Sequence, residues 1–114
     1  MKYSDKQRVE RIYRNTVELL KYIEDNSITR EQLLNSQTIQ WTVTTPLYNI
    51  GEHANNLSEK FADTHPSIPW DTIAGLRHRL VHGYDDINWE IIADVIYTDL
   101  PVLKKLLDEL LSDQ

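Results

Sequence analysis

The chain has 114 residues and a formal net charge of −6, and it contains no cysteine. This length fits one domain spanning residues 1–114 with a modest core, and the lack of thiols excludes disulfides and thiolate metal sites. The acidity argues against broad binding along nucleic-acid backbones but leaves room for a small basic site.

Two helix starts are visible in the first third of the chain. The pattern Ser4–Gln7 is typical of a capping box, and the apolar stripe behind it predicts a helix that stops at Asn26–Ser27. Thr29–Gln32 can cap a short second helix that runs through Leu34. The stripe of the first helix consists of Val9, Ile12, Leu19, Leu20 and Ile23.

A longer apolar seam follows, with spacings of 4, 3, 4, 3 and 4 residues. It consists of Val43, Leu47, Ile50, Ala54, Leu57 and Phe61. This seam predicts a long helix from about Gln37 to about Ala62. Pro46 lies inside it and either kinks the helix or marks its true start, because proline removes a backbone donor.

The segment from His65 to Pro69 is the proline-rich linker of the chain. Pro69 suits the first turn of a next helix, which Gly83 can cap at its C-terminal end. Asn88 can cap a last helix, and Pro101 is expected to kink it. The apolar stripes of these helices are Ile73, Leu76 and Leu80, and then Ile92, Val95, Ile96, Leu100, Leu103, Leu107 and Leu110.

These elements predict an all-α bundle of four main helices, with a short fifth helix as an option. Three aromatic residues on a further helical face have two interpretations. Trp41, Tyr48 and Trp89 either remain for self-association or complete the core of a monomer. Residues 1–13 are charged and no apolar run approaches membrane-span length, so we expect a cytoplasmic protein without a signal peptide or membrane partner.

The residues best suited to chemistry gather in Gly75–Tyr84, which holds two arginines, two histidines and no acid. Arg77 and His82 lie five residues apart, so on a regular helix their side chains point about 140° away from each other. If the helix ends at His82, before Gly83, the imidazole can turn back toward the guanidinium. A second subunit could also complete the site. The pair suits phosphate chemistry, and the alternative is a solvated helix end whose cations favour the helix dipole.

Two other arrangements involve neighbours of this pair. His78 and His82 share a helix face and could hold zinc, but the further ligands have no clear source, so no metal site is expected. A second option concerns the long helix, where Gly51 permits close approach of another helix. Glu52, the carboxylate next to Gly51, could then pair with Arg77 or Arg79 of the next helix.

Three short motifs follow one another in a specific order along the chain. They are Ile-Gly-Glu at residues 50–52, Ile-Pro-Trp at 68–70, and an arginine, a histidine and a tyrosine at 77, 82 and 84. In this order the chain resembles the HepT-like branch of the HEPN superfamily over roughly residues 46–111. Two positions depart from the usual pattern. His78 stands where asparagine is common, and His53 where a small residue is usual, so substrate and rate can differ from those of relatives.

The resemblance implies a HEPN-type bundle that forms a homodimer with paired motifs facing a shared cleft. It also implies a metal-independent endoribonuclease toxin of a type VII-like toxin-antitoxin module, with no cofactor. The partner would be a minimal nucleotidyltransferase antitoxin that transfers AMP to the motif tyrosine. By position, Arg77 and His82 would be catalytic and Tyr84 the AMP acceptor. Residues expected to support the site or contact substrate are His78, Arg79 and Glu52.

In the predicted reaction His82 takes the proton from a ribose 2′-hydroxyl, which attacks the adjacent phosphate while Arg77 stabilises the developing charge. The substrate would be RNA, such as tRNA or mRNA, and not DNA. The proton donor for the leaving oxygen stays open among a second His82, His78 and Tyr84. Two alternatives also stay open: a non-catalytic module that binds nucleotide, RNA or a partner, and a Tyr84 that only packs against the last helix.

Overall fold

The computed structural model describes residues 2–81 and 86–113, and every regular element in that part of the chain is helical. The prediction of an all-α fold is confirmed. Four long helical segments and two short helices follow one another along the chain. They are α1 (Asp5–Asp25), α2 (Arg30–Asn35), α3 (Gln37–Asn55), α4 (Glu59–Thr64), α5 (Trp70–Leu80), and the segment formed by α6 (Trp89–Asp94), the π-helical turn η2 (Val95–Asp99) and α7 (Leu100–Ser112).

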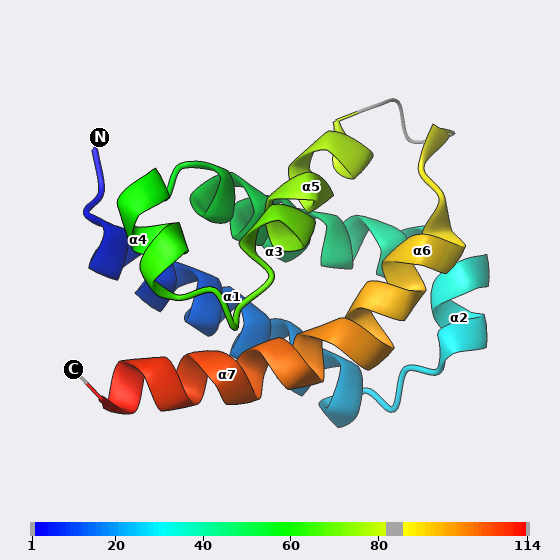
Figure 1. Ribbon diagram of the computed structural model, residues 1–114. Coiled ribbons are helices and arrows are strands. Elements are labelled where there is room, and N and C mark those ends of the chain that lie inside the picture. Colours follow the sequence, from blue (N-terminus) through cyan, green and yellow to red (C-terminus); the bar gives the residue numbers. More distant parts are fainter. Residues whose placement is uncertain (1, 82–85, 114) are drawn as a thin grey trace.

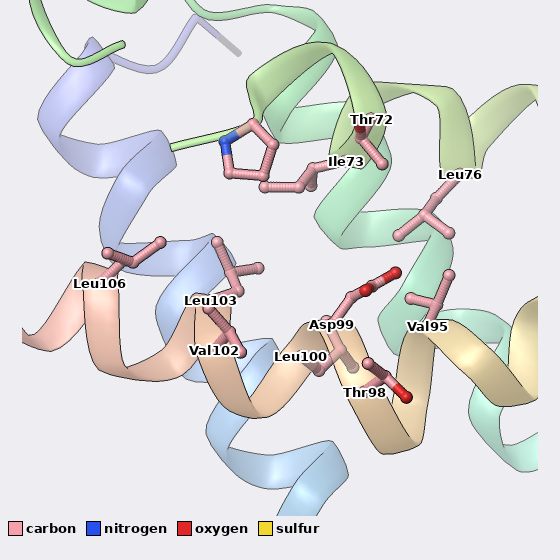
Figure 2. Close-up of a pocket in the computed structure, with 11 residues that line it drawn as sticks. Thr72, Ile73, Leu76, Val95, Thr98, Asp99, Leu100, Val102, Leu103 and Leu106 are labelled. Atoms are coloured by element: carbon pink, nitrogen blue, oxygen red, sulfur yellow. The ribbon is translucent and has the colours of Figure 1, made fainter. Parts of the chain in front are cut away.

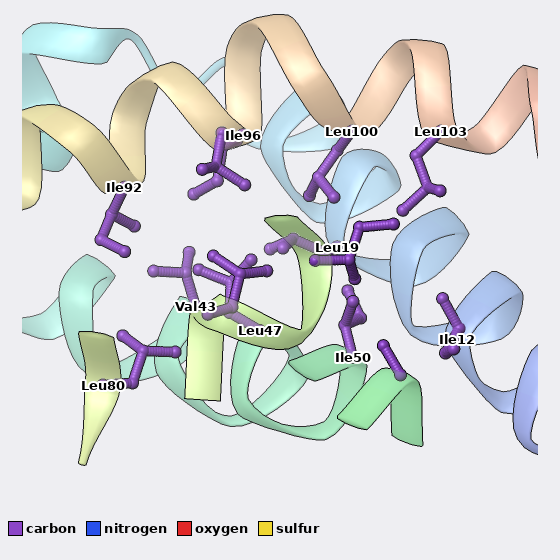
Figure 3. Packing of buried hydrophobic residues seen from close by; sticks show 14 of the residues in the cluster. Ile12, Leu19, Val43, Leu47, Ile50, Leu80, Ile92, Ile96, Leu100 and Leu103 are labelled. Atoms are coloured by element: carbon purple, nitrogen blue, oxygen red, sulfur yellow. The ribbon is translucent and has the colours of Figure 1, made fainter. Parts of the chain in front are cut away.

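Helix α3 lies at the centre of the bundle and packs against α1 on one side and α5 on another. Figure 1 shows α7 running along α1, while α2 lies beside α6 at the opposite end from the two chain termini. The core forms where these helices meet, as Figure 3 shows. Its fully buried side chains include Ile12, Val43, Leu47, Ile50, Ile92, Ile96, Leu100 and Leu107.

The predicted helix starts are confirmed. The Ser4 hydroxyl accepts a hydrogen bond from the Gln7 backbone N–H, and the Gln7 side-chain oxygen accepts one from the Ser4 backbone N–H, which completes the capping box of α1. Thr29 and Gln32 form the same reciprocal pair at α2. The Asn88 side chain accepts from two backbone N–H groups at the start of α6. Such caps depend on residues only three positions apart, so a single sequence reveals them.

The prediction of one helix from about Gln37 to about Ala62 is wrong, because α3 ends at Asn55 and α4 begins at Glu59. A contact between distant parts of the chain accompanies the break. The Asp5 carboxylate accepts hydrogen bonds from the Ser58 backbone N–H at 2.9 Å and from its hydroxyl at 2.7 Å. Ser58 in turn caps α4. The regular spacing of apolar residues in the sequence continues across this break, but the helix does not.

The prolines have specific places. Pro46 lies inside α3, so it does not mark the start of that helix. Pro69 is the N-cap of α5, one residue before the first turn in which it was expected. Near Pro101 the helix does not continue regularly, and a π-helical turn over Val95–Asp99 precedes α7. A wide turn fits this position, because proline has no N–H to give to the carbonyl one turn back.

The three aromatic residues divide between the two interpretations. Tyr48 and Trp89 are partly buried against the core, whereas Trp41 is 58% exposed. Tyr48 and Trp89 therefore contribute to the monomer. None of the described helices combines the length and the apolar character that a membrane crossing would require.

Candidate active site

Gly51 brings the last turn of α5 close to the C-terminal part of α3. A Cβ atom at this position would lie 2.6 Å from the Arg77 backbone nitrogen and 3.2 Å from the Arg77 Cα. Any side chain here would therefore push α5 away from α3. The predicted close approach at Gly51 is confirmed, and it places Arg77 directly beside Glu52.

The Arg77 guanidinium is held by two side chains of α3. Its Nε lies 2.5 Å from Oε2 of Glu52, and the Arg77 and Glu52 side chains are 45% and 37% exposed. A hydrogen bond with Tyr48 and the charge of Glu52 raise the pKa of Arg77 above its ordinary value. The pairing of Glu52 with an arginine of the next helix, predicted from the sequence, is confirmed for Arg77. Glu52 and Tyr48 orient the guanidinium from the α3 side, and the guanidinium remains open to solvent.

His78 and Arg79 face a different recess. They line a cavity of about 210 Å³ together with Asp86 and Asn88, and both side chains are exposed. Arg77 is not among the described residues that line it. Within the part of the chain that the structure describes, Arg77 and His78 therefore belong to separate surfaces of α5.

Helix α5 ends at Leu80, and Val81 occupies its C-cap position. The helix thus ends two residues before His82, earlier than the end at His82 considered from the sequence. His82, Tyr84 and the predicted cap Gly83 lie outside the described residues.

The zinc alternative gains no support from the described residues. Across residues 2–81 and 86–113, no group of three or more histidine, cysteine, aspartate or glutamate side chains is placed to hold a metal ion. One of the two histidines on which that alternative rests, His82, lies outside this part of the chain.

A family model described as "Ribonuclease HepT-like" matches residues 7–110, which is most of the chain. The chain belongs to the HepT-like family. The match begins within α1, so the resemblance seen over residues 46–111 extends to the N-terminal helix as well.

Individual HepT-like relatives agree with this placement. A Thermococcus cleftensis protein named "Probable ribonuclease HepT" is 31% identical over 112 residues, covering 96% of this chain and 98% of its own. A Methanocaldococcus jannaschii protein named as a candidate RNase is 36% identical over 88 residues, covering 77% of this chain and 73% of its own. A similarly named protein of Caldanaerobacter subterraneus is 38% identical over 65 residues, covering 57% and 58%. No solved structure matches.

The pocket between α5 and the η2–α7 segment has a different character from the arginine site. Figure 2 shows it, and its volume is about 340 Å³. Its lining is mostly aliphatic, with side chains such as Ile73, Leu76, Val95, Leu100 and Leu103. None of the predicted site residues is among its described lining residues, and it offers no cation for a phosphate.

His53 belongs to a second polar cluster of this HepT-like chain, which the sequence did not reveal. Its Nδ1 accepts a hydrogen bond from Nη1 of Arg8 at 3.2 Å. Burial, followed by the charges of Arg8, Arg11 and Arg14, lowers the pKa of His53, and only Glu52 opposes them. We call Arg8, Arg11 and Arg14 the α1 arginine patch. Their recurrence every third residue along α1 is the only signal of it in the sequence.

Proposed function

We propose that this HepT-like protein is an endoribonuclease toxin that cleaves RNA without a metal ion. The observation that carries the proposal is the Arg77 guanidinium, fixed by Glu52 and Tyr48 yet 45% exposed, five residues before His82. Membership of a family described as ribonucleases supports the same reading. A planar, permanently charged fork held in one orientation suits the oxygens of a phosphodiester.

The proposed reaction is a transesterification. His82 accepts the proton of a ribose 2′-hydroxyl, and the 2′-oxygen bonds to the adjacent phosphorus. The bond from phosphorus to the 5′-oxygen of the next nucleotide breaks, and that oxygen takes up a proton. Arg77 stabilises the charge on the phosphate oxygens in the transition state. The products are a 2′,3′-cyclic phosphate and a free 5′-hydroxyl.

In this proposal the protein works as a homodimer and is silenced by a minimal nucleotidyltransferase antitoxin. The antitoxin would transfer AMP to Tyr84, two residues from His82. The added phosphodiester could pair with Arg77 or Arg79 and occupy the position that an RNA phosphate needs. Light scattering that shows a monomer with full activity would remove the dimer from the proposal.

The first experiment measures cleavage of RNA in the presence of EDTA. We expect cleavage to persist and to leave 2′,3′-cyclic phosphate ends. The His82→Ala variant should lose at least about a hundredfold in rate, the usual contribution of a general base. A matched control is Val81→Ala, one residue earlier and 53% exposed, which should keep its rate.

Three results would contradict the proposal. Cleavage abolished by EDTA would point to metal-dependent chemistry. RNA binding without cleavage would point to a binding module. Full activity in a folded His82→Ala variant, checked by circular dichroism, would remove the proposed base.

The second experiment tests the modification. The protein is co-expressed with a minimal nucleotidyltransferase, taken from the neighbouring reading frame if one is encoded there, and weighed by intact mass spectrometry. We expect the mass of one or more AMP units, absent in Tyr84→Phe. Unchanged mass, or AMP mapped to another residue, would rule out Tyr84 as the acceptor.

A further inference from the structure

The positive charge of this acidic protein is concentrated at its N-terminal end. Residues 2–14 hold five of the 12 lysines and arginines but only two of the 18 acidic residues. The remainder of the chain is correspondingly more acidic than the net charge of −6 suggests. A local positive potential of this kind attracts anionic partners even when the whole molecule repels them.

The partners of the α1 arginine patch leave its charge in place. Arg11 lies over the Tyr3 ring with its Cζ 4.2 Å from the centroid, and Arg8 does so at 5.5 Å. The Tyr3 ring meets His53 edge to face at 5.4 Å. These contacts orient the guanidinium groups without neutralising them, because aromatic rings and a neutral imidazole carry no net charge.

The α1 arginine patch has carboxylates near it in the sequence but forms no ion pair with any of them in the described part of the chain. Among residues 2–81 and 86–113, ion pairs join Lys21 to Asp25, Arg30 to Asp94 and Arg77 to Glu52, and the patch takes part in none of them. Glu10 lies between Arg8 and Arg11 in the sequence and is exposed, and Asp5 accepts two hydrogen bonds from Ser58. Burial first, and then the charges of the patch, lower the pKa of His53.

The patch is connected to Arg77 through two consecutive residues of α3. His53 contacts Arg8, and the preceding residue, Glu52, holds Arg77. One turn of α3 therefore links the α1 arginines to the proposed scissile-phosphate site. Residues three apart on a helix lie about 5–6 Å from each other, so the long side chains of Arg11 and Arg14 can reach neighbouring phosphates of one strand.

We propose that the α1 arginine patch binds the phosphate backbone of single-stranded RNA beside the phosphate held by Arg77. This assignment rests on the proposed function and names the part of the protein that holds the substrate next to the site of cleavage. Guanidinium groups suit this role because each can present paired donors to a phosphate, and no base is read. The patch would therefore supply affinity and not sequence preference.

The test measures binding of fluorescently labelled single-stranded RNA to the full chain carrying His82→Ala, so that the probe stays intact. The patch variant is Arg11→Gln with Arg14→Gln, which spares the Arg8–His53 contact. The control is Lys104→Gln with Lys105→Gln, which removes the same charge from exposed positions of α7. Affinities are measured over a range of salt concentrations.

We expect the patch variant to lose about tenfold or more in affinity, and its plot of log K against log salt to flatten by about 1.4. That slope change corresponds to two lost phosphate contacts on a single strand, at about 0.7 each. The control should change neither the slope nor the affinity beyond the general effect of two charges. If the double variant is unstable in a thermal melt, Arg14→Gln alone should give about half of the slope change.

Equal affinities and slopes in patch and control variants would overturn the assignment. So would RNA binding independent of the patch combined with patch-dependent binding to anionic lipid vesicles. The proposed function fails in a different way: the chain with His82 intact would not cleave RNA, while RNA binding would still depend on the patch. That result would leave the present assignment standing.

Discussion

Arg77 and Glu52 form the contact on which the proposed site depends. Both side chains are more than one-third exposed, so their ion pair contributes little to the free energy of folding. Its value is geometric, because Glu52 takes the Nε edge of the guanidinium and fixes the plane of the fork. The carboxylate also repels a phosphate, so we interpret Glu52 as a positioning residue and not as a substrate ligand.

The sequence predicted part of this residue-level arrangement. The pair could be expected because Glu52 follows Gly51, and a glycine in a helical seam indicates close packing of another helix. Tyr48 was assigned only to packing or self-association, although it also contacts Arg77. The Arg8–His53 contact joins residues 45 positions apart, and no local pattern reports a pairing of that kind.

The lowered pKa of His53 leads to a prediction about how the free energy of unfolding depends on pH. Burial and the α1 arginine patch lower its pKa below the ordinary value of 6.5, with Glu52 acting in the opposite direction and the Tyr3 ring uncharged. As the pH falls through 6.5, the unfolded chain therefore binds a proton at this position before the folded chain does. The free energy of unfolding should decrease as the solution is acidified, and above 6.5 the group should contribute nothing.

The measurement is chemical unfolding at several pH values from about 7.5 to about 5.5, followed by circular dichroism, on the natural chain and on His53→Asn. The asparagine amide can still accept from Arg8 but does not titrate. The variant should lose less stability on acidification than the natural chain. Parallel curves for the two proteins would show that His53 is not responsible.

At the scale of elements, the helix caps and the end of α1 at Asn26 were predictable, and the end of α3 was not. The caps of α1, α2 and α6 follow from side chains within three residues of the backbone groups they satisfy. The end of α3 does not, because the apolar seam continues through Leu57 and Phe61 into α4. The hydrogen bonds from Ser58 to Asp5 bridge 53 residues, so the break became visible only in the folded chain.

The packing of α5 on α3 allows a sharp test with two glycines. Gly51→Ala would place a Cβ 2.6 Å from the Arg77 backbone nitrogen, so the helices must separate. We expect a loss of about 1–3 kcal/mol in the free energy of unfolding, the usual cost of overpacking, and a large loss of RNA cleavage. Unfolding and cleavage assays on the same preparation measure both.

Gly75→Ala is the matched control on α5 itself. A Cβ there meets no heavy atom within 4 Å, and the residue lies inside the helix. We expect a gain of about 0.5–1 kcal/mol, since alanine is a better helix former than glycine, with cleavage retained. Equal stability changes in the two variants would contradict the packing account.

At the scale of the whole molecule, the helical period of the apolar residues was enough to predict the all-α class. The relative placement of the helices was not, and it decides which charged residues meet. Three helices contribute to one polar surface: α1 supplies the arginine patch, α3 supplies Tyr48, Glu52 and His53, and α5 supplies Arg77. An acidic chain can thus carry a locally basic surface.

The central claim is that Arg77 acts on the transition state of RNA cleavage, and one comparison tests it most directly. Arg77→Lys keeps the charge but loses the planar fork. The control is Arg30→Lys, because Arg30 also pairs with a carboxylate, Asp94 at 2.8 Å, and is 44% exposed. The turnover number and the RNA dissociation constant are measured for both variants and for the natural chain.

We predict that Arg77→Lys lowers the turnover number by about a hundredfold or more, comparable to the loss of one transition-state donor, while RNA affinity changes by less than about threefold. Arg30→Lys should leave both quantities within about twofold of the natural chain, as expected for a partly exposed pair away from the site. Equal losses of turnover and affinity in Arg77→Lys, or full activity in that variant, would contradict a catalytic role for Arg77.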